Sequence, residues 1–106
     1  AHGTVFGGVI LSYIDVAGGV EAVRHTKHER FVTVAMKEVI FHEPDFIGDL
    51  VSFYATTVKV GKTSITVHVE VEAERFGNKG EVVRVTSADL IFVAINEKRE
   101  KVAIGK

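Results

Sequence analysis

The chain has 106 residues, the size of one compact domain, with 46% apolar and 25% charged residues, an ordinary globular balance. Its formal net charge of −1 gives no overall field that would attract nucleic acid or anionic lipid. It contains no cysteine, which excludes a disulfide scaffold, a thiolate metal site and a cysteine nucleophile. No apolar run approaches the roughly 20 residues that span a bilayer, so we expect a cytoplasmic protein with no membrane or nucleic-acid partner.

The first quarter of the chain predicts one long helix, because apolar residues recur at helical spacing over 6–26. Thr4 is the expected cap, and the helix should stop near Lys27 to Glu29. Two glycine pairs, Gly7-Gly8 and Gly18-Gly19, lie within it, although each glycine costs about 1 kcal/mol against alanine. We expect close approach of another backbone or a ligand to be the reason for them.

Nearly everything after residue 31 alternates between apolar and polar residues or runs as β-branched residues, which predicts strands. The expected strands are 31–42, 50–60, 63–76 and 82–95, with tight turns at 61–62 and 77–80 and a short edge strand or ordered tail at 102–104. One very apolar helix can be covered only if the sheet wraps around it. The chain 1–106 is therefore predicted to be a single α+β domain with the hotdog fold, an antiparallel sheet around one long central helix. A domain this short also leaves much of its surface unburied, so we expect self-association.

Asp15 is the one acid inside the most apolar part of the predicted helix, between Ile14 and Val16. A carboxylate in apolar surroundings is a stronger base, although a structural aspartate bonded to a neighbouring serine or backbone group is the competing reading. Gly7 and Gly8 open the same helix, where free backbone N–H groups could hold a developing oxyanion. If the helices of a dimer run antiparallel, Asp15 of one subunit could face the helix start of another.

A family resemblance is carried by residues 4–15, which read TVFGGVILSYID and resemble the G-G-x-L-x-x-x-x-D motif of hotdog acyl-CoA thioesterases, in particular the YciA-like branch. The similarity continues through Val32-Thr33-Val34, the Gly48-Asp49 turn, Gly61-Lys62-Thr63-Ser64 and the last long strand, and so covers nearly the whole chain.

The resemblance implies a site between two subunits that hydrolyses acyl-CoA to a free acid and CoA. Asp15 would be the general base or the nucleophile, and backbone amides near Gly8 the oxyanion donors. Members often carry Asn or Asp, which orients water or substrate, at the place of Thr4, so Thr4 departs from the pattern and His2 could take over. Relatives also begin with a strand before this motif, so we expect an N-terminal strand that this chain lacks.

The segment Gly61-Lys62-Thr63-Ser64 ends in the letters of a phosphate loop, but Thr56 stands at the place of its first glycine and a strand follows, so we reject a nucleoside-triphosphate site. The resemblance implies instead that this hairpin borders the CoA nucleotide, with Lys62 either at a phosphate or simply solvated. Arg84, together with Arg75, could complete a phosphate patch.

Other chemistries have weaker support. His25 and His28 lie three residues apart without a third ligand at a telling spacing, so no metal is expected. Ser12 lies in mid-helix outside any G-x-S-x-G elbow, so a serine hydrolase is not expected. A hotdog hydratase would need a histidine at short spacing after Asp15, and none stands there.

Several alternatives stay open at this point. The same fold could serve as an acyl-CoA binding or sensing domain, in which Asp15 would be only structural. No resident cofactor is expected, since CoA is part of the substrate. The acyl length is open, and candidate tunnel residues are Leu11, Tyr13, Phe41, Phe53 and Phe92. A dimer is the expected minimum for a shared site, and the resemblance suggests hexamers built as trimers of dimers.

Overall fold

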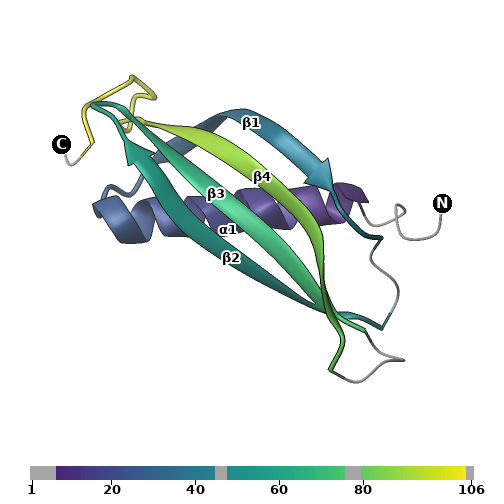
Figure 1. Ribbon diagram of the computed structural model, residues 1–106. Helices are drawn as coiled ribbons and strands as arrows, with labels where there is room; N and C mark the ends of the chain where they lie inside the picture. The colour runs from purple at the N-terminus through teal and green to yellow at the C-terminus, as the bar shows by residue number, and fades with distance from the viewer. Residues whose placement is uncertain (1–6, 45–47, 76–79, 105–106) are drawn as a thin grey trace.

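The computed structural model describes residues 7–44, 48–75 and 80–104. Helix α1 (Gly7–Thr26) is followed by four strands, β1 (Phe31–Phe41), β2 (Leu50–Val60), β3 (Ser64–Glu74) and β4 (Val82–Ala94). All paired strands are antiparallel, and their order in the sheet is β1-β4-β3-β2. Figure 1 shows α1 lying across one face of the twisted sheet. The predicted helix and the four predicted strands are confirmed. Residues 102–104 form the ordered tail and not the edge strand, because the N–H groups of Val102 and Ile104 donate to the carbonyls of Ala94 and Lys62 at 2.9 and 2.8 Å.

Helix α1 ends at Thr26 because Lys27 takes a left-handed backbone conformation, with φ of 66°. The Lys27 N–H still donates to the carbonyl of Val23 at 2.8 Å. The Thr26 hydroxyl donates to the carbonyl of Ala22 at 2.7 Å and accepts the His28 N–H at 3.1 Å. These contacts satisfy groups that the last helical turn would otherwise leave free, so the helix stops where the sequence predicted.

The core lies between α1 and the inner face of the sheet. Alternate residues of β3 are fully buried there, and the helix contributes a short apolar face. The buried apolar side chains of α1 and β3 are Ile10, Ile14, Ala22, Ile65, Val67, Val69, Val71 and Ala73. This periodicity of two on β3 fixes which face of the sheet meets the helix.

Gly18 is required by the packing of α1 on β4. A Cβ at this position would lie 3.1 Å from Cζ of Phe92, closer than ordinary van der Waals contact, whereas one at Gly19 would have 3.9 Å. The expectation of a backbone or ligand at this glycine pair is therefore wrong for Gly18, because an aromatic side chain occupies the space.

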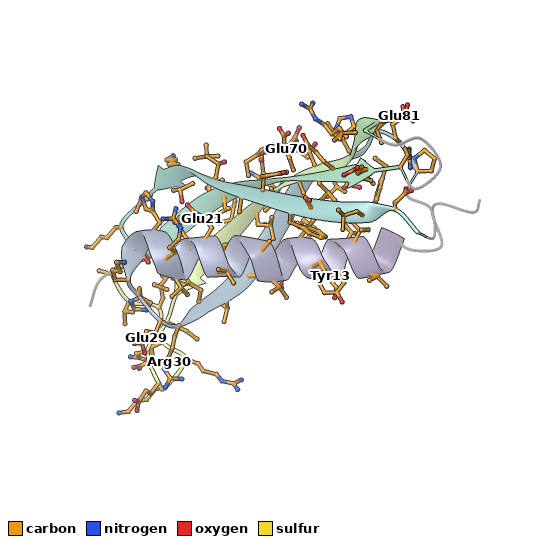
Figure 2. The ribbon with its side chains drawn as sticks, turned by 90° about the horizontal axis from the view of Figure 1, so that it is seen from below. Tyr13, Glu21, Glu29, Arg30, Glu70 and Glu81 are labelled. Carbon is orange, nitrogen blue, oxygen red and sulfur yellow. The ribbon has the colours of Figure 1, made fainter. Side chains whose placement is uncertain are left out.

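Glu21 links α1 to β2 by a side-chain hydrogen bond on the buried side of the helix. Its carboxylate accepts the Thr57 hydroxyl at 2.7 Å and Arg24 Nε at 2.9 Å. Burial raises the pKa of Glu21, but the hydrogen bonds from Thr57 and Arg24 outweigh it and hold the pKa below its ordinary value. In Figure 2, Glu21 points from α1 toward the strands. The ionised carboxylate thus fixes the position of the helix relative to edge strand β2.

Candidate active site

Asp15 lies in the middle of α1, on the side of the helix that faces β1. Its side chain is half-buried, and its Oδ1 accepts a hydrogen bond of 2.7 Å from the hydroxyl of Thr33 on β1. The surroundings of the carboxylate are therefore less apolar than its sequence neighbours indicated. A charge-assisted bond of this length restricts the rotation of the carboxylate and sets the direction of its oxygens. Thr33 had no predicted role, although it stands in the Val32-Thr33-Val34 segment that carries part of the resemblance.

The carboxylate lies at an edge of the sheet. Among the described residues, β1 is an outer strand with β4 as its pairing partner. The register shifts between Thr33 and Ala35, so that Val34 has no pairing partner and exposes 55% of its area. An open edge with an exposed apolar residue is a surface that another chain can approach. The pair Asp15–Thr33 therefore lies where a second subunit can reach it.

Gly8 belongs to the first turn of α1, which begins at Gly7. The first N–H groups of a helix have no partner within the helix, and the positive end of its dipole favours negative charge. Gly8 and Asp15 are seven residues apart, or about 10 Å along the axis at 1.5 Å per residue. That separation is too large for both to contact one carbonyl group from the same helix. Thr4 and His2 lie outside the described residues.

The hairpin between β2 and β3 is held by its backbone. The Gly61 N–H donates to the carbonyl of Ser64 at 2.7 Å. The carbonyl of Thr63 accepts the N–H of Ala94 at 2.8 Å, and that of Lys62 accepts the N–H of Ile104 at 2.8 Å. These bonds leave the side chain of Lys62, which is an exposed residue, available to solvent or a ligand.

The two arginines of the expected phosphate patch are not brought to this hairpin. On β4, Arg84 pairs with Glu72 while Val93 pairs with Ser64, so Arg84 lies eight β3 residues away, roughly 26 Å at 3.3 Å per residue. Its Nε lies 3.4 Å from Oε1 of Glu70.

The prediction for Arg75 is wrong. Its Nη1 donates to Oδ2 of Asp49 at 2.7 Å and to the carbonyl of Pro44 at 2.9 Å. Only 12% of its side chain is exposed, because these contacts hold it between the segment before β2 and the end of β3. An arginine used in this way is not free for a phosphate.

The outer face of the sheet carries a charged cluster that the sequence did not indicate. Nδ1 of His68 lies 2.6 Å from Oδ1 of Asp89, and its Nε2 lies 3.2 Å from Oε2 of Glu70. The hydrogen bond with Asp89 raises the pKa of His68; burial opposes this, and Glu70 adds to it. Figure 2 shows Glu70 on the side of the strands away from α1. The cluster is therefore separated from Asp15 by the sheet.

The remaining histidine pair has local roles. Nε2 of His28 lies 3.0 Å from the carbonyl oxygen of Ile95, and Nδ1 of His25 lies 4.0 Å from Oε2 of Glu21. Within 7–44, 48–75 and 80–104, no group of three His, Asp or Glu side chains could hold a metal ion. Helix α1 is also not apolar enough over its length to cross a membrane.

The candidate tunnel residues Tyr13 and Phe92 have different surroundings. The rings of Tyr13 and Phe53 lie 5.9 Å apart, and Tyr13 also lines an open hollow of about 350 Å³ with Val9, Ser12 and Val16. Phe92 is buried in the core beneath Gly18.

Residues 2–76 match the family model of the thioesterase superfamily, which covers more than half of the chain. Together with the antiparallel sheet around one helix and the anchored aspartate, this match shows that the chain belongs to the thioesterase superfamily.

Two curated relatives are similar over most of the chain. An uncharacterized acyl-CoA thioester hydrolase of Zymomonas mobilis is 41% identical over 93% of this chain and 65% of its own length. The acyl-CoA thioester hydrolase YciA of Salmonella typhimurium is 36% identical over 91% of this chain and 73% of its own length. The chain thus spans about two thirds of the length of the first of these relatives. The predicted resemblance to the YciA branch is confirmed.

Two solved structures share the fold. A hexameric hotdog-fold thioesterase of Campylobacter jejuni superposes with a TM-score of 0.86 and is 43% identical, covering 94% of this chain and 76% of that one. A hexameric broad-specificity acyl-coenzyme A thioesterase superposes with a TM-score of 0.88 and is 36% identical, covering 96% and 70% of the two chains. The predicted hotdog fold is confirmed.

Proposed function

We propose that this chain hydrolyses acyl-CoA thioesters to a free carboxylic acid and CoA. The observation that carries the proposal is the carboxylate of Asp15, held by the Thr33 hydroxyl at the edge of the sheet. The relatives named acyl-CoA thioester hydrolases support the choice of substrate class. CoA is part of the substrate, so the proposed reaction uses no resident cofactor. The cytoplasmic location expected from the sequence stays a prediction.

In the proposed reaction, Asp15 takes a proton from a water molecule that adds to the thioester carbonyl carbon. Backbone amides around Gly8 of a second copy hold the negative charge that develops on the carbonyl oxygen. The carbon–sulfur bond then breaks, and the sulfur of CoA leaves with the proton that Asp15 had taken. Thr33 keeps the carboxylate turned toward the water throughout.

Direct attack by the carboxylate is the alternative route. Asp15 would then form a mixed anhydride with the acyl group and expel CoA, and water would hydrolyse the anhydride. A single turnover in ¹⁸O-water detects the anhydride route wherever water attacks the carbonyl of Asp15. With Asp15 as base, ¹⁸O enters only the released acid, whereas attack of water on the Asp15 carbonyl of an anhydride would leave ¹⁸O in the protein.

We further propose that the active unit is a pair of chains joined along β1, and that the pairs assemble into hexamers as trimers of dimers. The distance of about 10 Å between Gly8 and Asp15 along α1 supports a site shared between copies. The open edge of β1 beside Asp15 supports its location, and the two hexameric thioesterases of similar structure support the size of the assembly.

The decisive experiment is a thiol-release assay on the full chain with short, medium and long acyl-CoAs. We expect steady release of one thiol for each acid formed, with a preference among chain lengths that the assay identifies. The second candidate function is an acyl-CoA binding or sensing domain. Tight binding of a non-hydrolysable acyl-CoA without turnover of any chain length would contradict hydrolysis and favour that candidate.

A further inference from the structure

An open hollow on α1 lies next to the carboxylate of Asp15. Its volume is about 350 Å³, and the side chains that line it are those of Val9, Ser12, Tyr13 and Val16. Val16 follows Asp15 directly in the chain. Ser12 precedes Asp15 by three residues, which makes their side chains neighbours on the helix surface. The hollow therefore begins where the proposed reaction takes place.

Asp15 and Tyr13 lie on opposite flanks of α1. The carboxylate of Asp15 accepts its hydrogen bond from Thr33 on β1. The ring of Tyr13 lies 5.9 Å from that of Phe53 on β2. Among the described residues, β1 and β2 are the two outer strands of the sheet. Asp15 is thus nearer one edge of the sheet and Tyr13 nearer the other.

The hollow lies between these two flanks, on the side of α1 away from the sheet. Successive helical residues are about 100° apart, so Ser12 lies about 60° and Tyr13 about 160° round the helix from Asp15. Val9 and Val16 lie between Ser12 and Tyr13 and expose 50% and 60% of their area. Figure 2 shows Tyr13 on the side of α1 that faces away from the strands. From the carboxylate, Tyr13 is therefore the far wall of the hollow.

The lining of the hollow suits an alkyl chain. Two valines and the ring of Tyr13 present carbon to it, and the described residues that line it include no charged side chain that could hold a phosphate. Its volume of about 350 Å³ is near the lower end of the roughly 300–1,000 Å³ that small-molecule sites occupy. These properties indicate a short or medium acyl chain as its occupant.

Tyr13 is supported from behind by the core. Its ring is tilted by 58° to the ring of Phe53, a common arrangement of two aromatic side chains in contact. Phe53 is partly buried and packs against the hydrophobic core. Because the core is close-packed, a ring backed by it resists displacement by a ligand. Tyr13 can therefore act as a fixed wall rather than as a mobile cover.

We propose that the hollow receives the acyl chain of the substrate and that Tyr13 limits the length of that chain. The inference rests on the proposed hydrolysis of acyl-CoA and adds to it a residue that determines specificity. A chain whose thioester lies at Asp15 passes over Val16 and then meets the ring of Tyr13. Each methylene group up to that point gains by leaving water. A longer chain has to leave the hollow or displace the ring.

The first test compares kcat/KM of the full chain and its variants over a series of saturated straight-chain acyl-CoAs. We expect Tyr13→Ala to move the optimum to longer chains. Each methylene group newly buried corresponds to about fourfold in kcat/KM, so a chain two methylene groups beyond the wild-type optimum should gain roughly tenfold relative to that optimum. Tyr13→Phe keeps the ring and should keep the wild-type profile.

The matched control is Tyr54→Ala. Tyr54 exposes the same 56% of its area as Tyr13, but it lies on β2 opposite Glu70, on the outer face of the sheet. We expect the wild-type profile for this variant. Val9→Phe fills the hollow and should move the optimum to shorter chains. An unchanged profile for Tyr13→Ala would overturn the inference, whether or not the mass of the assembly changes, and so would the same shift in Tyr54→Ala.

A binding measurement separates this inference from the proposed function. The chain has no tryptophan and two tyrosines, so Tyr13 is the only source of tyrosine fluorescence in Tyr54→Phe. The probes are S-alkyl-CoA thioethers of increasing length, which lack the carbonyl group that hydrolysis needs. We expect the fluorescence of Tyr13 to change at saturation once the alkyl chain is long enough to reach the ring.

The two possible failures are distinguishable in this way. Unchanged fluorescence of Tyr13 at saturation with every thioether would overturn the inference. A change that depends on alkyl length, combined with no hydrolysis of any acyl-CoA by the wild type, would support the hollow as an alkyl site and contradict only the proposed function.

Discussion

The hydroxyl of Thr33 donates a hydrogen bond of 2.7 Å to Oδ1 of Asp15, and so links edge strand β1 to the middle of α1. The two residues are 18 positions apart and belong to different elements, so the bond exists only when the helix lies correctly on the sheet. It connects the position of the helix to the orientation of the carboxylate that we propose as the base or nucleophile.

Replacing Thr33 by valine is expected to lower kcat by roughly 10- to 100-fold, the loss that corresponds to about 1.5–3 kcal/mol for a hydrogen bond to a charged group. KM should change little, because Thr33 positions Asp15 and does not hold the substrate. Steady-state thiol release measures both constants. Thr33→Ser keeps the hydroxyl and should recover most of kcat; equal loss in both variants would show that the hydroxyl does not position Asp15.

Replacing Gly8 by proline removes one backbone N–H at a helix position where proline is tolerated. We expect Gly8→Pro to lose most thiol release, whereas Gly8→Ala, which keeps the N–H, retains much of it. Mixing Gly8→Pro with Asp15→Asn subunits after dissociation should recover about a quarter of wild-type activity, because half of the random pairs then hold one intact shared site. No recovery in reassembled mixtures would contradict a site shared between copies.

The two central glycines should respond oppositely to alanine. Gly19→Ala meets only ordinary contacts and should raise the free energy of unfolding by about 0.5–1 kcal/mol through helix propensity. Gly18→Ala forces its Cβ against the ring of Phe92, and overpacking of this kind costs roughly 1–3 kcal/mol. Urea unfolding compares the two variants, and equal effects would show that the contact with Phe92 does not limit position 18.

His68 should make stability depend on pH. Its pKa in the folded chain is raised, first by the hydrogen bond with Asp89, so its protonated form stabilises the fold. This contribution is fully present below the ordinary value of 6.5 and is lost as pH rises through the raised pKa. We therefore expect His68→Gln to lower the free energy of unfolding more at acid than at alkaline pH. Denaturant titrations at both pH values check this, and the difference should disappear in an Asp89→Asn background.

The elements were predictable because their patterns are local. Alternation along 64–74 distinguished the buried face of β3 from its outer face, and the apolar repeat of 7–26 gave the helix. Asp15 was found for the same reason, since an acid in an apolar helical stretch is visible without knowledge of the fold.

The contacts between distant elements could not be predicted in this way. Arg75 was expected at a phosphate, but the chain brings Asp49 to it from 26 residues away. Arg84 was expected to contribute to the same CoA-binding site as the hairpin at Lys62. The register of β3 with β4 places the two far apart within the chain. Thr33 carried no signal of its own, because a threonine in a strand is common and only the placement of α1 on β1 gives it a partner.

The most direct test of the account is the rate of thiol release by the full chain with aspartate or asparagine at position 15. Asparagine keeps an oxygen that can accept the Thr33 hydrogen bond, so Asp15→Asn should leave the fold, the assembly and the affinity for acyl-CoA unchanged. Because it removes the group that takes the proton, we predict that kcat falls by about 10²–10⁴-fold. Wild-type turnover by a folded Asp15→Asn variant would contradict the central claim that this carboxylate performs the hydrolysis.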